Sequence, residues 1–127
     1  MIFKLSLIYS IGYIKMANGI HLIVDVFDIE NVELLKNLEC VYQLAYQIID
    51  TSNLNVIKQS NHQFKPCGYT ALYLLAESHM SFHSYPEKKC LSFDLYCCNP
   101  DLNVRDVLHI IYNFFDKPRI NHQIVYR

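Results

Sequence analysis

Three stretches of β-type sequence follow one another between two helical patterns, and no other feature of this chain constrains its fold as strongly. Strands are expected at residues 69–77, 79–85 and 88–98, where β-branched and aromatic residues are frequent and turn-forming residues lie at the ends. Helices are expected on either side, at residues 31–49 and 103–115, where apolar residues recur at helical spacing. Strands grouped in this way favour an antiparallel sheet with the helices packed on one face.

Three further strands are expected at residues 21–28, 53–64 and 120–127. Asn31 and Asn103 are expected to cap the two helices, since an asparagine side chain accepts hydrogen bonds from the first amide groups of a helix. A chain of 127 residues with 52% hydrophobic residues has the size and the core of one domain. The prediction is a single α+β domain over residues 1–127, a two-layer sandwich of an antiparallel sheet with helices on one face.

Charge and cysteine content argue against several classes of protein. The formal net charge is −1 and no basic stripe alternates with aromatic residues, so no nucleic-acid partner is expected. The five cysteines are odd in number and form no C-x-x-C motif, which argues against a disulfide framework and a zinc ribbon. Reduced thiols in the cytoplasm fit this pattern better.

The N-terminus is apolar but predicts no membrane segment. The run at residues 2–14 contains Lys4 and is shorter than the about 20 residues that a membrane-spanning helix needs. The residues after it form a poor cleavage site for a signal peptide. Residues 1–18 are therefore expected to be an N-terminal extension, either an additional strand or a frayed segment, with Met16 as an alternative start.

A short segment, ESHMSFHSYPE at residues 77–87, is rich in groups that act as bases and nucleophiles. In an extended conformation His79 and His83 share one face. No metal site is expected, because these histidines and the later cysteines match no common ligand spacing. Cys97 and Cys98 are adjacent in an expected strand and face opposite sides, so one of them is expected in the core. These residue types alone leave a hydrolase-like site and a binding site both open.

Three segments within residues 19–99 share a pattern with one known family: GIHLIVDVF, FKPCGYTALYLLAESHMSFHSYPE and FDLYCCN. They resemble the prokaryotic-type S-adenosylmethionine decarboxylases. That family shows an opening G-x-H strand, an aromatic-x-P-x-G-x-(S/T) segment, an E-S-H…H…P-E block and an acidic strand that ends in T-C-G. Two details differ, because the last motif reads Cys97-Cys98-Asn99 and Tyr85 replaces a tryptophan-like aromatic residue.

The resemblance implies a proenzyme that cleaves itself. The chain would break between Glu77 and Ser78, and Ser78 would become a covalent pyruvoyl group. Its ketone would hold the substrate amine as a Schiff base and accept the electrons released with CO₂. Thr70 and His83 match residues that assist the cleavage, with His83 as the base. A turn around Ser81 is expected to bring His83 close to Ser78.

The resemblance also implies S-adenosylmethionine as the substrate and a homodimer of cleaved protomers. Cys98 matches the proton donor, Glu87 the residue that holds the ribose hydroxyls, and Phe64 an aromatic residue that stacks on adenine. The product would supply aminopropyl groups for spermidine synthesis. Two alternatives stay open: a pyruvoyl-dependent decarboxylase of ornithine or arginine, and a non-catalytic homologue that acts as a binding partner.

Overall fold

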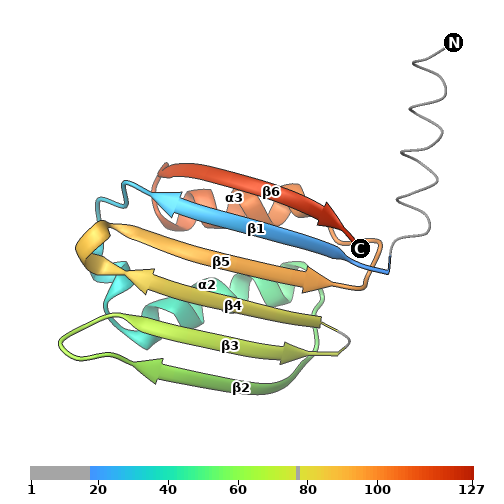
Figure 1. The fold of residues 1–127 in the computed structure, drawn as a ribbon, viewed down its shortest axis with the longest axis horizontal. Coiled ribbons are helices and arrows are strands. Elements are labelled where there is room, and N and C mark those ends of the chain that lie inside the picture. The colour runs from blue at the N-terminus through green and yellow to red at the C-terminus, as the bar shows by residue number, and fades with distance from the viewer. Residues whose placement is uncertain (1–17, 77) are drawn as a thin grey trace, which may run out of the picture.

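The computed structural model describes residues 18–76 and 78–127, which form one sheet with helices against one side (Figure 1). The strands are β1 (Ile20–Phe27), β2 (Val56–Gln63), β3 (Tyr69–Leu75), β4 (Ser78–Tyr85), β5 (Cys90–Cys97) and β6 (Arg119–Tyr126). The helices are α2 (Leu38–Thr51) and α3 (Val104–Phe114), with short 3-10 helices η1 (Val32–Leu35) and η2 (Pro86–Lys88). Residues 1–17 of the expected extension, and Glu77, lie outside the described residues.

The six strands form an antiparallel sheet in the order β2-β3-β4-β5-β1-β6. The consecutive strands β3, β4 and β5 are neighbours in the sheet, as their grouping in the sequence predicted. Both α2 and α3 lie on the same side of it (Figure 1). The predicted α+β sandwich is therefore confirmed.

Side chains of each strand alternate between a face covered by the helices and a face that we call the open face. The buried side chains of β5 are Leu91, Phe93, Leu95 and Cys97, and those of α2 are Val41, Leu44, Ala45 and Ile48. Burial of a large apolar side chain contributes about 1.5–3 kcal/mol. This shared core fixes the two helices to one face of the sheet and leaves the open face available for chemistry.

The first helical pattern is interrupted, unlike the continuous helix expected from Asn31. Asn31 makes no side-chain capping bond, and α2 begins only at Leu38. The Gln63 side chain stabilises the interruption. Its Oε1 accepts a hydrogen bond from the Leu38 N–H at 2.9 Å, and its Nε2 donates to the Lys36 carbonyl at 2.7 Å. A contact from β2 thus overrides the local helical signal.

The second helix, α3, begins and ends where its sequence predicted. Asn103 Oδ1 accepts hydrogen bonds from the N–H groups of Arg105, at 3.0 Å, and Asp106, at 3.3 Å. The helix ends at Phe114, before Pro118, and β6 begins at the next residue. The expected cap at Asn103 is confirmed.

The prediction of a turn around Ser81 is wrong. β4 continues unbroken through this residue, which is paired with Leu72 of β3 and with Asp94 of β5. Met80 and Phe82, on either side of it, are buried in the core. A bend here would break two ladders of backbone hydrogen bonds and expose both apolar side chains, so the strand stays straight.

Candidate functional site

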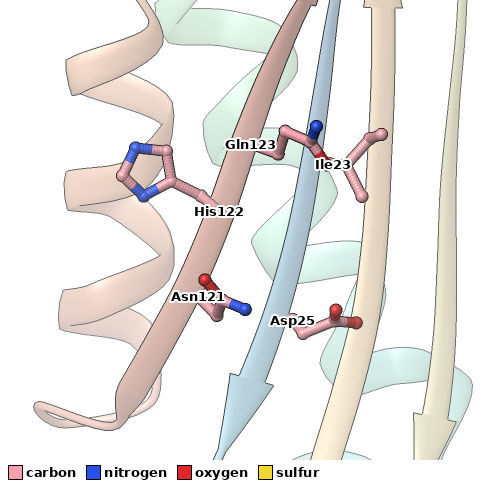
Figure 2. Close-up of a pocket in the computed structure, with 5 residues that line it drawn as sticks. All are labelled: Ile23, Asp25, Asn121, His122 and Gln123. Atoms are coloured by element: carbon pink, nitrogen blue, oxygen red, sulfur yellow. The ribbon is translucent and has the colours of Figure 1, made fainter.

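Polar side chains form a row across the open face of the sheet. Register places Thr70 of β3 opposite His83 of β4, and the row continues through Ser92 of β5 to Asp25 of β1. The Ser92 hydroxyl donates to the Asp25 carboxylate at 3.0 Å. Figure 2 shows the end of the row, where a hollow of 300 Å³ is lined by Ile23, Asp25, Asn121, His122 and Gln123. Two of the predicted site residues therefore lie on a face that neither α2 nor α3 covers.

Thr70 and His83 form a hydrogen-bonded pair. The Thr70 Oγ1 lies 3.1 Å from the His83 Nδ1, and both side chains are half-buried. When Nδ1 of a neutral imidazole carries the proton, it donates to the threonine oxygen and Nε2 keeps a lone pair. The pair can then present Nε2 as a base in a fixed orientation.

Phe64 and Glu87 lie at the same end of the sheet as this pair. The Phe64 N–H donates to the Gly68 carbonyl at 2.8 Å, and a Cβ at Gly68 would stand 3.4 Å from the Pro86 Cδ. Gly68 has a φ of +106°, which only glycine adopts without strain. Glu87 follows Pro86 in η2 and is exposed. Phe64 is 47% exposed, and its ring meets the His62 ring edge-on, with 4.6 Å between their centroids.

Ser78 and Cys98 meet at the opposite end of β4. The Cys98 backbone N–H donates to the Ser78 Oγ at 3.3 Å. A cavity of 180 Å³ borders both residues and is also lined by Asn53, Leu54, Asn55, Leu75, Ala76, Cys97 and Asn99. Cys97 is 1% exposed and Cys98 is half-buried, so the expectation that one of the two packs into the core is confirmed.

The predicted site residues are therefore divided between the two ends of β4. Ser78 and His83 are five residues apart on an unbroken strand, which separates them by about 16 Å at a rise of about 3.3 Å per residue. A base must approach the proton that it removes to within about 3 Å, or act through one water. Within one chain, the structure does not bring His83 to Ser78.

A third group of side chains lies beside Cys98 on the open face, and of its members the sequence analysis named only His79. The ring centroids of His21 and His79 are 6.3 Å apart, and those of His79 and Tyr96 are 5.7 Å apart. His21 Nε2 lies 3.3 Å from Asp94 Oδ1. Burial, followed by a hydrogen bond with Cys98, raises the pKa of the Tyr96 hydroxyl. Strand alternation could have placed these residues on one face, but their meeting depends on register between distant strands.

Among residues 18–76 and 78–127, no three side chains of His, Cys, Asp or Glu come together as ligands for a metal ion. In the same residues, no helix has both the length and the apolar character needed to cross a membrane.

The fold and the site together define a class of protein. It is a two-layer α+β protein with a serine and a thiol at one end of a central strand and a threonine–histidine pair at the other end. Residues 20–127 match a family model described as S-adenosylmethionine decarboxylase. The chain belongs to the S-adenosylmethionine decarboxylase family.

Individual relatives agree with this assignment. The S-adenosylmethionine decarboxylase proenzyme of Picrophilus torridus is 34% identical over 89 residues, which are 70% of this chain and 68% of that protein. The proenzyme of Archaeoglobus fulgidus is 27% identical over 112 residues, 88% of this chain and 99% of that protein. The crystal structure of the adenosylmethionine decarboxylase from Aquifex aeolicus superimposes with a TM-score of 0.79 and 26% identity, covering 87% of this chain and 91% of that one. These names support neither of the two alternatives.

Proposed function

We propose that this chain is the proenzyme of an S-adenosylmethionine decarboxylase and that it cleaves itself between Glu77 and Ser78. The observation that carries the proposal is the setting of Ser78 at the start of β4. Its Oγ accepts a hydrogen bond from the Cys98 N–H at 3.3 Å, beside a cavity of 180 Å³. A pyruvoyl group derived from Ser78 fits this setting, because a hydrogen-bond donor and open space adjoin the residue that forms it. When present, that group supplies a sink for the electrons released with CO₂.

Cleavage needs only groups of the chain and water. The Ser78 Oγ attacks the Glu77 carbonyl carbon; a C–O bond forms, the C–N bond breaks, and the amine takes up the proton, which leaves an ester. A base then removes the Ser78 α-proton, and the Cβ–O bond breaks to release the Glu77 carboxylate. The remaining dehydroalanine tautomerises and reacts with water, which gives the ketone and ammonia. We assign the base to His83, with Thr70 as its hydrogen-bond partner.

His83 and Thr70 act on Ser78 of a second copy in this proposal. The separation of about 16 Å along β4 argues against action within one chain. Leu72 and Leu74 on the open face are 45% and 51% exposed, which suits burial between two protomers. Stacked sheets pack about 10 Å apart. A two-fold axis running across the strands would place the His83 end of each sheet over the Ser78 end of its partner. By strand alternation the Ser78 side chain lies with Met80 on the helix side of β4, so the base would approach the Ser78 backbone, from which it takes the α-proton.

Recognition of the substrate is assigned to exposed groups near His83. The Phe64 ring offers a face to adenine, and the Glu87 carboxylate offers acceptors to the ribose hydroxyls. Cys98, which adjoins Ser78, donates the proton that replaces CO₂. An exposed aromatic ring and a carboxylate at the same end of the sheet suit a nucleoside better than a basic amino acid. The substrate would therefore lie between the Ser78 end of one copy and the Phe64 end of the other.

The cysteines support a reducing compartment. Cys40, Cys67, Cys90, Cys97 and Cys98 form no disulfide in the structure. Proteins that keep several thiols reduced are typical of the cytoplasm, and we place this enzyme there. Its product would supply aminopropyl groups for spermidine synthesis.

Release of labelled CO₂ from a panel of carboxyl-labelled substrates tests the activity. The cleaved protein should decarboxylate S-adenosylmethionine in preference to ornithine and arginine, and the Ser78→Ala variant should release none. Preference for ornithine or arginine would overturn the assigned substrate. A fully cleaved protein that releases CO₂ from none of the three would overturn the activity.

A further inference from the structure

The ring of Tyr96 lies directly over Gly19. Ile20 is opposite Cys97 in the register of β1 and β5, so Gly19 comes opposite Cys98. A Cβ at Gly19 would stand 2.7 Å from the Tyr96 Cε2 and 2.8 Å from both its Cζ and its hydroxyl oxygen. The phenol end of Tyr96 therefore occupies space that opens only because residue 19 has no side chain, and this space adjoins Cys98.

Further groups restrict the position of the Tyr96 ring. The His79 ring centroid lies 5.7 Å from that of Tyr96, and the His21 ring centroid lies 6.2 Å from it. The Arg127 guanidinium carbon is 5.6 Å from the ring centre, within the range of a cation–π contact. The Arg127 backbone also pairs with Gly19 through two hydrogen bonds of 2.9 Å. The ring thus has neighbours from β1, from β4 and from the end of the chain.

Tyr96 and Cys98 lie on the same face of the sheet. The two residues are two positions apart on one extended segment, so both side chains lie on the open face. A hydrogen bond joins them and contributes, after burial, to the raised pKa of Tyr96. A phenol with a raised pKa keeps its proton and acts as a donor, and a thiolate is an acceptor for it.

We propose that Tyr96 is a positioning residue for the Cys98 thiol, which it orients through its hydroxyl and stabilises once the thiol has lost its proton. The inference rests on the proposed role of Cys98 as proton donor. In that step the S–H bond breaks, the proton goes to the substrate carbon and the electron pair stays on sulfur. The Tyr96 O–H donates to the resulting thiolate, and a proton from water later restores the thiol. Delivery of the proton to the correct carbon depends on this orientation.

Alkylation of Cys98 tests the contact without any need for activity. The measurement uses Ser78→Ala protein, which stays unprocessed, with iodoacetamide at pH 7 and mass spectrometry to follow each cysteine. Tyr96→Phe removes the hydroxyl that donates to the sulfur, so the sulfur loses one hydrogen bond as it attacks the reagent. The rate at Cys98 should therefore fall by about threefold. Tyr46→Phe, which alters an exposed tyrosine on α2, is the matched control and should leave the rate unchanged.

Gly19→Ala tests the same contact without altering Tyr96 or Cys98. The new methyl group would meet the end of the Tyr96 side chain, which can rotate away at little cost, so the protein should fold. Alkylation of Cys98 should then slow as in Tyr96→Phe. Unchanged Cys98 alkylation in both folded variants would overturn the proposal.

Inactivation during turnover distinguishes the positioning role of Tyr96 from the role of Cys98 as proton donor. In cleaved protein, Tyr96→Phe should raise the number of inactivation events per CO₂ released, because wrong protonation converts the pyruvoyl group to alanine. In a Cys98→Ala background the same substitution should add nothing, as expected for two residues that act as a unit. If Cys98→Ala leaves the inactivation ratio unchanged, the donor assignment fails, while slower alkylation in Tyr96→Phe would still establish the contact. If Tyr96→Phe increases inactivation equally with and without Cys98, the positioning role is wrong.

Discussion

Two inactive variants, Ser78→Ala and His83→Ala, should restore self-cleavage when they are expressed together. Each variant alone should stay uncut, since one lacks the nucleophile and the other lacks the base. In a mixed dimer, the His83→Ala chain keeps Ser78, and its partner supplies His83. One of the two sites in such a dimer is then complete, and the other lacks both groups.

The structure sets the magnitude of this effect. His83 lies about 16 Å from Ser78 of its own chain, whereas proton transfer needs about 3 Å. No rotamer of a histidine covers that difference, so the complementation should depend entirely on the second copy. With equal amounts and random pairing, about half of the His83→Ala chains should be cut, and none of the Ser78→Ala chains.

The assay is a co-expression with distinguishable tags, followed by intact-mass analysis of each chain. His109→Ala, a histidine substitution on α3, replaces His83→Ala in the matched control and should itself be cut alone. If the mixed sample stays uncut while wild-type protein is cut, His83 does not act between chains. If His83→Ala is cut by itself, His83 is not the processing base.

Three further predictions concern the site and the core. Thr70→Val removes the hydroxyl that lies 3.1 Å from His83 Nδ1 and should slow self-cleavage about tenfold in a gel time course; an unchanged rate would leave Thr70 without its assigned role. Cys98→Ala should be cut normally but be inactivated during turnover. Cys97→Ala should lose about 1 kcal/mol of stability in urea and keep its activity. The opposite result would assign the role of proton donor to Cys97 instead of Cys98. Burial raises the pKa of Tyr73 to about 12 in the folded protein, above its ordinary value of 10, so its contribution to stability is complete below pH 10 and is lost as pH rises from there toward 12; Tyr73→Phe should flatten that loss in urea unfolding curves, and an identical slope would contradict it.

The local pattern of apolar residues and helix caps was sufficient to predict most of the fold. Alternation of apolar residues placed the strands, and Asn103 marked the start of α3 through a bond within its own first turn. The break before α2 was not predictable in this way, because Gln63 makes it from a strand 25 residues further along the chain. A single sequence does not show which side chain will compete with a helix for its backbone groups.

The candidate site shows the same limit. Motif resemblance selected Thr70, His83, Ser78 and Cys98, and the structure pairs the first two with each other and the last two with each other. The distance between the pairs follows from the straight course of β4, which depends on ladders to strands on both sides. The contact between Tyr96 and Gly19 was missed, since it needs the register of strands that are far apart in the sequence.

The mass of the purified wild-type chain tests the central claim most directly. Self-cleavage between Glu77 and Ser78 should yield two polypeptides, residues 1–77 and residues 78–127. The second should be about 17 Da lighter than a peptide that begins with serine, because an amine has been replaced by a ketone with loss of ammonia. Protein that keeps its full mass after long incubation, or a second polypeptide that still begins with serine, would contradict the account.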